Sequence, residues 1–500
     1  MQKSLWNDLN QKPSFHAVNE DIECDVLIVG GGIAGLSTAM ELKGTNLKIA
    51  IVEAREIAEL ASGRTTAKLT PLHQAIYRRL KDEKERAQVY AKANSHAVSL
   101  VKKWIRDNYI DCDLEQVPAV TFAIKEDDNY IIDEELKAAA IAGLKVREFD
   151  RRDSPVPCTR GVIHDDSYSF HVKKYLLGLA KVLSDSGVQI FENSRVQLLD
   201  NKTATANTFK IHAQSIVITT QAPILSKGLF FAKTFPKRSY IVGVKLKSGR
   251  LPQHNMIAVG NNYHSIRSVP SEQLLLIGGE EHKVGQEVDA HKRIDALINY
   301  TKEHFDIAAV PYQWSSQDLS SHDDLPFIGA IEDGLYVATG FSLWGMTQGT
   351  LAGYLIGNHI QNNKILDWSK YYDPNRTSSL FNLQSLKQNA DSSTQLVLDH
   401  FKPKAKFKDI PNGSGKVVQE SGEELAVYRG TDGDLKVVSA VCTHMGGLVQ
   451  FNKLEKTWDC PCHGARFDLN GQVINGPASK PLEDKKSIPL DDDQKKVINQ

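Results

Sequence analysis

The sequence contains 500 residues, more than one hydrophobic core usually organises, so two or more compact units are expected. Hydrophobic residues make up 41% of the chain and charged residues 24%, a composition typical of a soluble globular protein. The 60 basic and 61 acidic residues leave a formal net charge of -1, which excludes a broad electrostatic attraction to nucleic acid or to an anionic membrane. Small-molecule chemistry is the default expectation.

The N-terminal 25 residues contain no apolar run of the kind that a secretory signal needs. No apolar stretch approaches the roughly 18 residues that span a bilayer. Cys24, Cys112 and Cys158 lie far apart in sequence, as expected of a protein kept reduced. We therefore predict a cytoplasmic protein without a transmembrane segment.

Strands and helices alternate along most of the chain, which predicts a layered α/β protein. Apolar runs predict strands at 25–29, 47–54, 119–124, 188–193, 215–220, 239–246, 273–282 and 334–340. Helical spacing follows a glycine turn at 30–44 and recurs at 84–107, 173–187 and 345–360. The strands at 239–246 and 273–282 alternate like members of a separate sheet.

The first glycine turn has the spacing of a dinucleotide-binding motif. Gly30, Gly32 and Gly35 form G-x-G-x-x-G between a strand and a helix, and Glu53 ends the next strand 18 residues after Gly35. Glycines let the backbone approach a pyrophosphate, the helix N-terminus offers amide groups to its charge, and Glu53 can accept both ribose hydroxyls. The structural alternative is a glycine turn without a ligand, and FAD and NAD share this motif.

A change of composition marks the C-terminal third. From Asp367 to about Lys406 the chain is rich in Ser, Asn, Gln and Lys, which predicts a tail helix and a linker. Short strands with glycine turns follow at 416–419, 424–430 and 435–441. They predict a small all-β unit.

Two Cys–His pairs lie within this small unit. One residue separates Cys442 from His444, two separate Cys460 from His463, and fifteen lie between the pairs. Mixed Cys and His ligation suits a two-iron cluster, whose irons each need two terminal ligands. A structural zinc site is an alternative, although its spacings within a pair are usually longer. Haem attachment needs C-x-x-C-H, which this stretch lacks.

The two stretches C-T-H-M-G and C-P-C-H-G resemble the ligand loops of a Rieske [2Fe-2S] domain. The resemblance continues through residues 466–482 and covers about 95 residues. It implies that Cys442 and Cys460 bind one iron, and that His444 and His463 bind the other. The domains implied are an oxidoreductase domain at 1–375, a linker at 376–405 and a Rieske domain at 406–500.

Two departures from the Rieske pattern carry information. Many relatives have a cysteine where this chain has Gly447, so Cys462 has no disulfide partner within the motif. Relatives of high reduction potential have Ser and Tyr hydroxyls that donate to the cluster sulfurs, where this chain has Ala465 and Phe467. Because such donors raise the potential, we predict a value nearer roughly -150 mV than +300 mV.

Residues 25–42, 62–70 and 334–353 resemble the D-amino acid oxidase and glycine oxidase family of flavoproteins. The resemblance implies FAD as the dinucleotide. The residues that match the family's FAD-binding pattern are Gly30, Gly32, Gly35, Glu53, Arg64, Thr65, Thr66, Val196, Gly340, Gly345, Met346 and Thr347. No Cys or His occurs in residues 340–350, and Arg64 sits where some relatives have a linking histidine, so non-covalent FAD is expected.

Together the resemblances imply an α/β, Rossmann-like FAD-binding domain with an inserted α+β substrate domain, followed by a small all-β Rieske domain. An amine or amino acid would reduce FAD, and the Rieske cluster would carry electrons towards an acceptor protein or a quinone. His171, His282 and Trp344 are candidates for places near the flavin, but no catalytic residue is assigned. Two alternatives remain: an NAD(P)H-dependent reductase that supplies an oxygenase, and a C-terminal unit with only a docking role.

Overall fold

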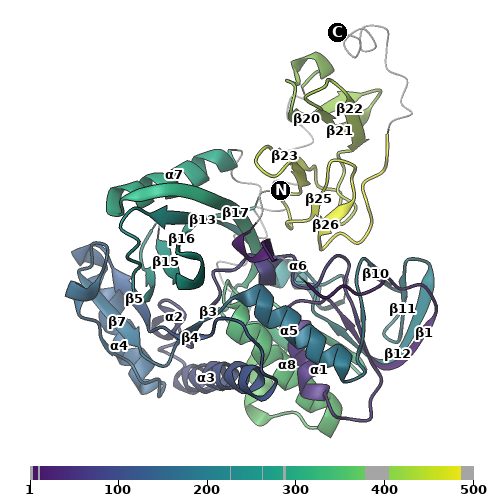
Figure 1. Cartoon of the computed structure of the whole chain (residues 1–500). Coiled ribbons are helices and arrows are strands. Elements are labelled where there is room, and N and C mark those ends of the chain that lie inside the picture. Colours follow the sequence, from purple (N-terminus) through teal and green to yellow (C-terminus); the bar gives the residue numbers. More distant parts are fainter. Residues whose placement is uncertain are drawn as a thin grey trace.

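The computed structural model describes residues 4–9, 12–225, 227–261, 263–284, 289–377 and 405–485. Two large sheets with covering helices form the larger part of the molecule, and two small sheets form the C-terminal part beside it (Figure 1). The helices are α1 (Ile33–Leu42), α2 (Ile76–Arg79), α3 (Lys84–Asp107), α4 (Asn129–Ile141), α5 (Val172–Asp185), α6 (Phe230–Lys233), α7 (Ala290–His304) and α8 (Gly345–Asn362).

The first large sheet carries the predicted βαβ unit. Its strand order is β10-β11-β12-β1-β2-β9, and β19 pairs with both β12 and β18. Strand β1 runs parallel to β2 and β12, and α1 connects β1 to β2. The strands are β1 (Ile22–Val29), β2 (Ile49–Val52), β9 (Gln189–Phe191), β10 (Val196–Leu198), β11 (Thr203–Ala206), β12 (Phe209–Ile218), β18 (Phe327–Glu332) and β19 (Leu335–Thr339).

Helices α1 and α8 pack closely against each other because α8 has glycine at every fourth position of the contact. A Cβ atom on Gly353 would overlap Ser37 of α1, and one on Gly357 would overlap Glu41. The close packing places both helices in one layer on the sheet. The N-termini of α1 and α8 consequently lie beside the same cavity, which Gly32 and Gly345 both line.

The second large sheet is inserted between strands of the first. Its order is β17-β13-β16-β15-β14-β5-β7-β6, and the long strands β13 and β17 pair antiparallel. The strands are β5 (Ala119–Ala123), β6 (Arg147–Glu148), β7 (Arg160–His164), β13 (Thr234–Leu246), β14 (Asn255–Ala258), β15 (His264–Val269), β16 (Leu274–Lys283) and β17 (Ile307–Ser321). A short sheet, β3 (Lys68–Leu69), β8 (Tyr168–Ser169) and β4 (Glu115–Gln116), accompanies the two large ones.

The C-terminal part consists of a three-stranded and a four-stranded antiparallel sheet. The strands are β20 (Ser414–Glu420), β21 (Glu423–Arg429), β22 (Leu435–Ser439), β23 (Gln450–Asn452), β24 (Thr457–Asp459), β25 (Arg466–Phe467) and β26 (Val473–Asn475). This part has its own apolar core around Trp458 and Phe467. The predicted fold class, an α/β domain with an inserted α+β part and a small all-β domain, is confirmed.

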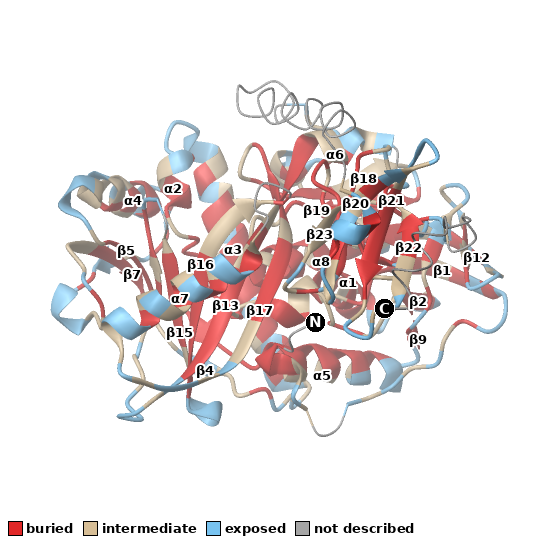
Figure 2. Cartoon of the chain, turned by 90° about the horizontal axis from the view of Figure 1, so that it is seen from above, coloured by how far each residue is buried: buried red, intermediate tan, exposed pale blue. Residues whose placement is uncertain are grey.

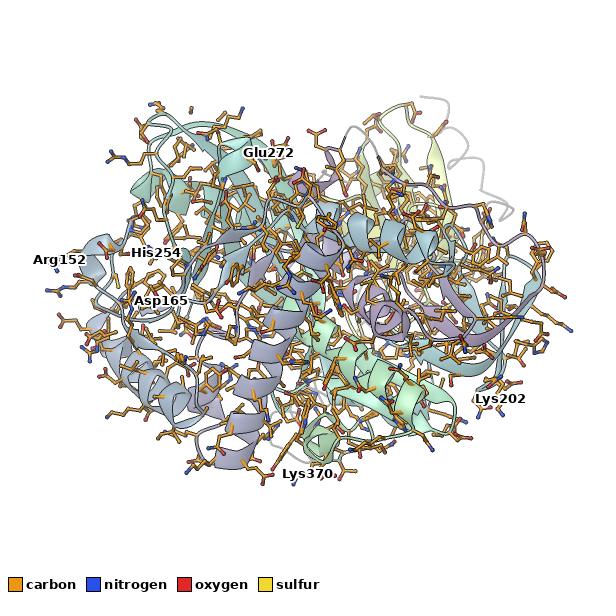
Figure 3. The ribbon with its side chains drawn as sticks, turned by 60° about the horizontal axis from the view of Figure 1, so that its bottom comes forward. Arg152, Asp165, Lys202, His254, Glu272 and Lys370 are labelled. Carbon is orange, nitrogen blue, oxygen red and sulfur yellow. The ribbon has the colours of Figure 1, made fainter. Side chains whose placement is uncertain are left out.

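Burial follows this architecture. The central strands of both large sheets and the faces of α1, α5 and α8 towards them are buried (Figure 2). Charged side chains such as Arg152, Asp165, Lys202 and Lys370 lie at the periphery (Figure 3). No helix within the described ranges is long and apolar enough to cross a membrane.

Most predicted elements are present near their predicted bounds. The helix predicted at 84–107 is α3, and the one at 345–360 is α8, which ends at Asn362. Strand β17 was missed because its sequence is polar and contains Pro311. Proline is tolerated there because β17 lies at the edge of its sheet. The tail helix and linker fall largely on residues 378–404, outside the described residues.

Candidate functional site

Two adjoining cavities lie at the carboxyl ends of the parallel strands of the first sheet. The large cavity has a volume of about 310 Å³ and the small cavity about 120 Å³. They share the lining residues Gly32, Ala61, Ser62, Thr219 and Gln221. Together they form an elongated site at the edge of an open α/β sheet, where this class of fold binds ligands.

The glycine turn forms one wall of the small cavity. Gly30 has a φ of +114°, which L-residues rarely adopt, and a Cβ atom there would lie 2.9 Å from the carbonyl oxygen of Thr219. A Cβ atom on Gly35 would overlap the carbonyl oxygen of Gly30. Gly32 caps α1, whose first amide groups border the cavities. The turn therefore requires glycine, and it leaves the backbone accessible to a phosphate group.

Glu53 follows β2 and lines the small cavity. Its Oε2 accepts a hydrogen bond from the backbone N–H of Gly31 at 2.7 Å, and its Oε1 accepts from that of Arg55 at 2.9 Å. Burial raises the pKa of Glu53, while the two backbone donors oppose that change. These bonds fix the carboxylate, whose remaining lone pairs can accept from hydroxyl groups of a ligand.

The structure brings most of the predicted FAD-binding residues to these two cavities. Gly30, Gly32, Glu53 and Val196 line the small cavity. Gly32, Arg64, Thr65, Thr66, Gly340, Gly345 and Met346 line the large cavity. Gly35 and Thr347 line neither: Gly35 lies behind the turn, and the Thr347 hydroxyl contacts His73 Nε2 at 2.9 Å.

The size and lining of the joined cavities fit FAD. The glycine turn and Glu53 suit a pyrophosphate and a ribose in the small cavity. The large cavity is bordered by the start of α8, whose N-terminal amide groups favour negative charge on a ligand. FAD would be held by the residues that line both cavities, and it would supply two-electron oxidation of a substrate there.

Sequence reasoning missed Lys68, which lines the large cavity. Its Nζ donates to the carbonyl of Met256 at 3.1 Å and also to Ser265 Oγ. Burial and the nearby Arg267 lower the pKa of Lys68 to about 7. Among the described residues, no carboxylate pairs with Lys68, so this wall of the cavity suits an anionic group.

Asp318 of β17 also lines the large cavity and was missed. Its Oδ2 accepts a hydrogen bond from the backbone N–H of Leu343 at 2.6 Å. Burial raises the pKa of Asp318 to about 6. Ser342 and Leu343 have positive φ angles of 51° and 72°, so the carboxylate holds a strained loop directly before α8. No sequence pattern marks Asp318, because its partner lies in another segment.

The three residues considered for the substrate side lie in different environments. His171 caps α5, accepting from the N–H of Lys174 at 3.2 Å, and it lines neither cavity. His282 contacts Tyr240 OH at 3.1 Å and also lies outside the cavities. Trp344 lines the large cavity and stacks on His73 at a ring distance of 4.4 Å. Of the three, only Trp344 reaches the cavity.

The two Cys–His pairs lie on adjacent loops of the C-terminal part. Cys442 and His444 follow β22, and Cys460 and His463 follow β24. Each loop is closed by backbone hydrogen bonds on either side of its cysteine, namely Cys442 N to Gly447 O (2.8 Å), Gly446 N to Cys442 O (2.9 Å), Cys460 N to Ala465 O (2.7 Å) and Gly464 N to Cys460 O (3.0 Å). The sequence spacing therefore produces two matching tight loops.

The two cysteines are buried and the two histidines are partly buried, in an arrangement that fits an iron–sulfur cluster. The rings of His444 and His463 lie 5.0 Å apart, and both Nδ1 atoms are buried without a hydrogen-bond partner. Buried polar atoms normally have partners, so these two nitrogens are suited to ligate a metal. Among the described residues, no group of three His, Cys, Asp or Glu side chains is arranged to hold a single metal ion. A [2Fe-2S] cluster does not need such a group, because each of its irons takes two protein ligands.

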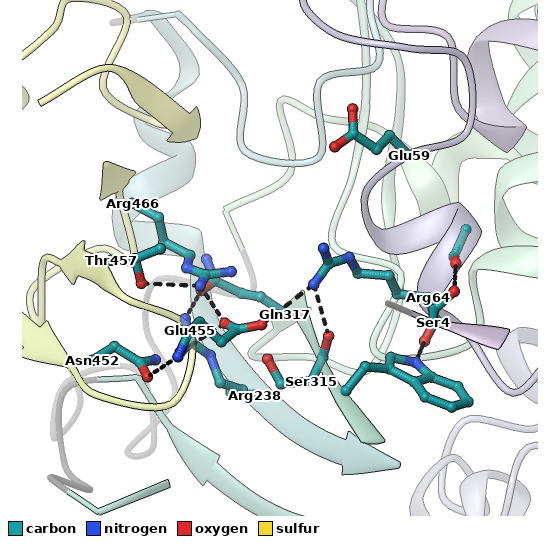
Figure 4. A network of polar contacts seen from close by, with 12 residues as sticks. Ser4, Glu59, Arg64, Arg238, Ser315, Gln317, Asn452, Glu455, Thr457 and Arg466 are labelled. Carbon is teal, nitrogen blue, oxygen red and sulfur yellow. Dashed lines mark hydrogen bonds and ion pairs between the residues drawn. The ribbon is translucent and has the colours of Figure 1, made fainter. Parts of the chain in front are cut away.

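A buried polar network joins the two parts of the molecule (Figure 4). Arg238 Nη1 of β13 donates to Asp459 Oδ2 at 2.8 Å, and Arg64 Nη1 lies 3.4 Å from Glu455 Oε1. Arg466 binds both carboxylates from the C-terminal side. Burial raises the pKa of Glu455, but the three arginines outweigh burial, so its pKa is lowered. The network fixes the C-terminal part on the flank of the second large sheet.

The same boundary brings both histidine rings against one aromatic ring. Phe231 of α6 lies edge-on to His444 at 5.9 Å and to His463 at 5.4 Å. Gln317 Nε2 of β17 donates at 2.7 Å to the carbonyl of Gly464, the residue after His463. The neighbouring Asp318 lines the large cavity. Strand β17 therefore contacts the cavity and the histidine loop through consecutive residues.

Two family models match separate stretches of the chain. The family model "FAD dependent oxidoreductase" matches residues 25–358, and the model "Rieske [2Fe-2S] domain" matches residues 400–487. The putative Rieske 2Fe-2S iron-sulfur protein YhfW of Bacillus subtilis is 32% identical over 98% of both chains.

Solved structures share the fold of the larger part. L-proline dehydrogenase from P. horikoshii has a TM-score of 0.60 at 17% identity and covers 72% of this chain and 98% of its own. Glycine oxidase from Geobacillus kaustophilus has a TM-score of 0.57 at 18% identity and covers 71% of this chain and 99% of its own. The predicted resemblance to the glycine oxidase family and to a Rieske domain is confirmed.

Proposed function

Because the chain belongs to the family of FAD dependent oxidoreductases and ends in a Rieske [2Fe-2S] domain, we propose that it oxidises the C–N bond of a small amine or amino acid and passes the electrons to the cluster. The observation that carries this proposal is the contact of Phe231 with both His444 and His463. The histidine side of the cluster site therefore faces the flavoprotein part. This arrangement suits electron transfer within one molecule.

We assign FAD to the two joined cavities and the cluster to the two Cys–His loops. The ring end of FAD is assigned to the large cavity, near Gly345 and Met346. Cys442 and Cys460 are assigned to one iron, and His444 and His463 to the other. FAD binding is proposed to be non-covalent. No cysteine lines either cavity, and this chain has Arg64 where some relatives have a linking histidine.

Residues adjacent in sequence separate the large cavity from the histidine pair. Phe235 and Ser320 line the large cavity, while their neighbours Pro236 and Leu319 line a smaller space with His444 and His463. Adjacent residues of β13 and β17 therefore border both sites. A fixed, short separation of this kind keeps donor and acceptor at high effective concentration.

The substrate class is supported by the lining of the large cavity and by the relatives. Lys68 supplies a buried cationic group, and no carboxylate among the described residues pairs with it. Such a group suits the carboxylate of an amino acid. The solved structures named above are a proline dehydrogenase and a glycine oxidase. Lys68 would orient the substrate, and the burial of the cavity wall would exclude water around the reacting bond.

Electrons would leave the cluster for a downstream acceptor protein or a quinone. No disulfide links any two cysteines in the described part of the chain, which supports a reducing compartment and hence a cytoplasmic location. The product of this scheme is an oxidised amine together with a reduced acceptor. Hydrogen peroxide would not be the main product.

Anaerobic mixing of the purified holoprotein with a panel of amines and amino acids tests the proposal. A substrate should bleach the flavin absorbance, and the spin signal of the reduced cluster should then rise without any added acceptor. Bleaching of the flavin while the iron stays ferric would overturn the proposed transfer. Bleaching by NADH or NADPH instead of an amine would identify a reductase, and absence of iron and sulfide would leave only a docking role.

A further inference from the structure

The Rieske domain forms part of the wall of the small cavity. Ile474 and Asn475 of β26 and the next residue, Gly476, line this cavity together with Gly30 and Glu53. The half of the dinucleotide that binds at the glycine turn is therefore enclosed by two domains. Ile474 is 4% and Asn475 6% exposed, so both residues are buried at the boundary between the domains.

Two hydrogen bonds hold β26 against the first large sheet. Arg195 Nη2 donates to the carbonyl of Val473 at 2.7 Å. Asn475 Nδ2 donates to Gln221 Oε1 at 3.1 Å. Arg195 lines the small cavity, and Gln221 lines both cavities. The residues that fasten β26 are thus themselves cavity residues.

Asn475 has one polar atom that these contacts leave unused. Its Oδ1 is buried and has no hydrogen-bond partner, although the residue lines the small cavity. A buried acceptor without a partner is uncommon in a folded protein. Hydroxyl groups of a ribose and the amino group of an adenine are donors of the kind that this oxygen can accept. The atom is therefore placed to bind the ADP half of a dinucleotide.

We propose that the Rieske domain is the lid that retains FAD. Asn475 accepts a hydrogen bond from the ADP half, and the dinucleotide leaves only after β26 separates from Gln221 and Arg195. This inference rests on the proposed position of FAD in the small cavity. It does not depend on the substrate or on electron transfer, because the contacts exist in the resting protein.

The lid links FAD binding to the docking of the two domains. If docking tightens the binding of FAD, bound FAD must in turn favour docking by the same free energy. Loading with FAD would therefore also fix the cluster site beside the flavin. A protein that has lost FAD would hold its Rieske domain less firmly.

A cross-link across the boundary tests the lid. A Cβ atom on Gly476 would lie 3.5 Å from the Cβ of Ala222, which is within the roughly 3.5–4.5 Å that a disulfide requires. The double variant Ala222→Cys with Gly476→Cys should form this disulfide, as checked by mass spectrometry. FAD release from the oxidised, substrate-free holoprotein is then followed by fluorescence of the free FAD.

The cross-linked protein should release FAD at least about tenfold more slowly than the same protein after gentle thiol reduction. The reduced sample serves as the matched control, because it carries the same two substitutions. Equal release rates would overturn the lid, and so would failure of the two cysteines to join. Since no substrate is added, failure of the lid and failure of the proposed amine oxidation are distinguishable.

Loosening the domain boundary should have the opposite effect. Arg238 lines neither cavity, so Arg238→Met changes docking without touching bound FAD. It should release FAD about tenfold faster than the wild type. Arg147→Met, which removes an exposed ion pair with Asp165 elsewhere, should leave release unchanged. Release that is unchanged in Arg238→Met, or equally fast in both variants, would contradict the lid.

Discussion

Arg238 of β13 and Asp459 of β24 form a buried ion pair, with Nη1 and Oδ2 2.8 Å apart, across the boundary between the two domains. The side chains are 3% and 9% exposed. Because both charges are removed from water, each needs the opposite charge of the other to offset its lost hydration. Asp459 also directly precedes Cys460, so the pair fixes a ligand loop with respect to the second large sheet.

Replacing Arg238 by methionine should destabilise the docked Rieske domain by about 2–5 kcal/mol, because Asp459 stays buried with one partner fewer. Denaturant unfolding followed by the visible signals of the two cofactors separately measures this loss. The Rieske signal should be lost at lower denaturant concentration. The exposed pair of Arg147 with Asp165 is the control, and Arg147→Met should cost about 1 kcal/mol or less.

Replacing Phe231 by leucine should slow electron transfer from the flavin to the cluster, since the side chain that contacts both histidine rings becomes shorter and loses its ring. Stopped-flow mixing with substrate should show flavin bleaching at the wild-type rate and a delayed rise of the reduced cluster. Phe209→Leu, at a partly buried position away from the boundary, serves as the control. Equal delays in both variants would remove Phe231 from the route.

The cluster should have a low reduction potential, nearer roughly -150 mV than +300 mV, because Ala465 and Phe467 offer no hydroxyl donors. Both residues are fully buried in the core of the C-terminal part. Ala465→Ser and Phe467→Tyr should each raise the midpoint measured by redox titration monitored by the cluster's spin signal. A strongly positive wild-type midpoint, or no rise in either variant, would refute this explanation.

Local patterns predicted the elements and both Cys–His loops because the information lies within a few residues. Helix α3 matches its predicted range, and the loops of Cys442 and Cys460 are closed by neighbouring backbone groups. Contacts between distant segments were not predictable from such patterns. Arg238 and Asp459 are 221 positions apart, and nothing in the residues around either one indicates the other.

The same limit explains why part of the site was missed. Lys68 and Ser265 are 197 positions apart, and only the fold brings the lysine into the cavity wall. Asn475 lies in a closing hairpin that the sequence assigns to the Rieske domain alone. Its place in the small cavity follows from the docking of two domains.

Lys68→Met should change how stability depends on pH. Burial lowers the pKa of Lys68 to about 7, whereas an unfolded lysine titrates near roughly 10.4. Between these values the unfolded chain binds more protons, so the wild type should gain about 1.4 kcal/mol of unfolding free energy per pH unit relative to the variant. Below about pH 7 Lys68 is charged in both the folded and the unfolded protein, so the full free-energy cost of burying the charge is present. Urea unfolding from about pH 7 to 9.5 measures this difference; parallel curves for the wild type and Lys68→Met, or an equal change in the exposed control Lys145→Met, would contradict it.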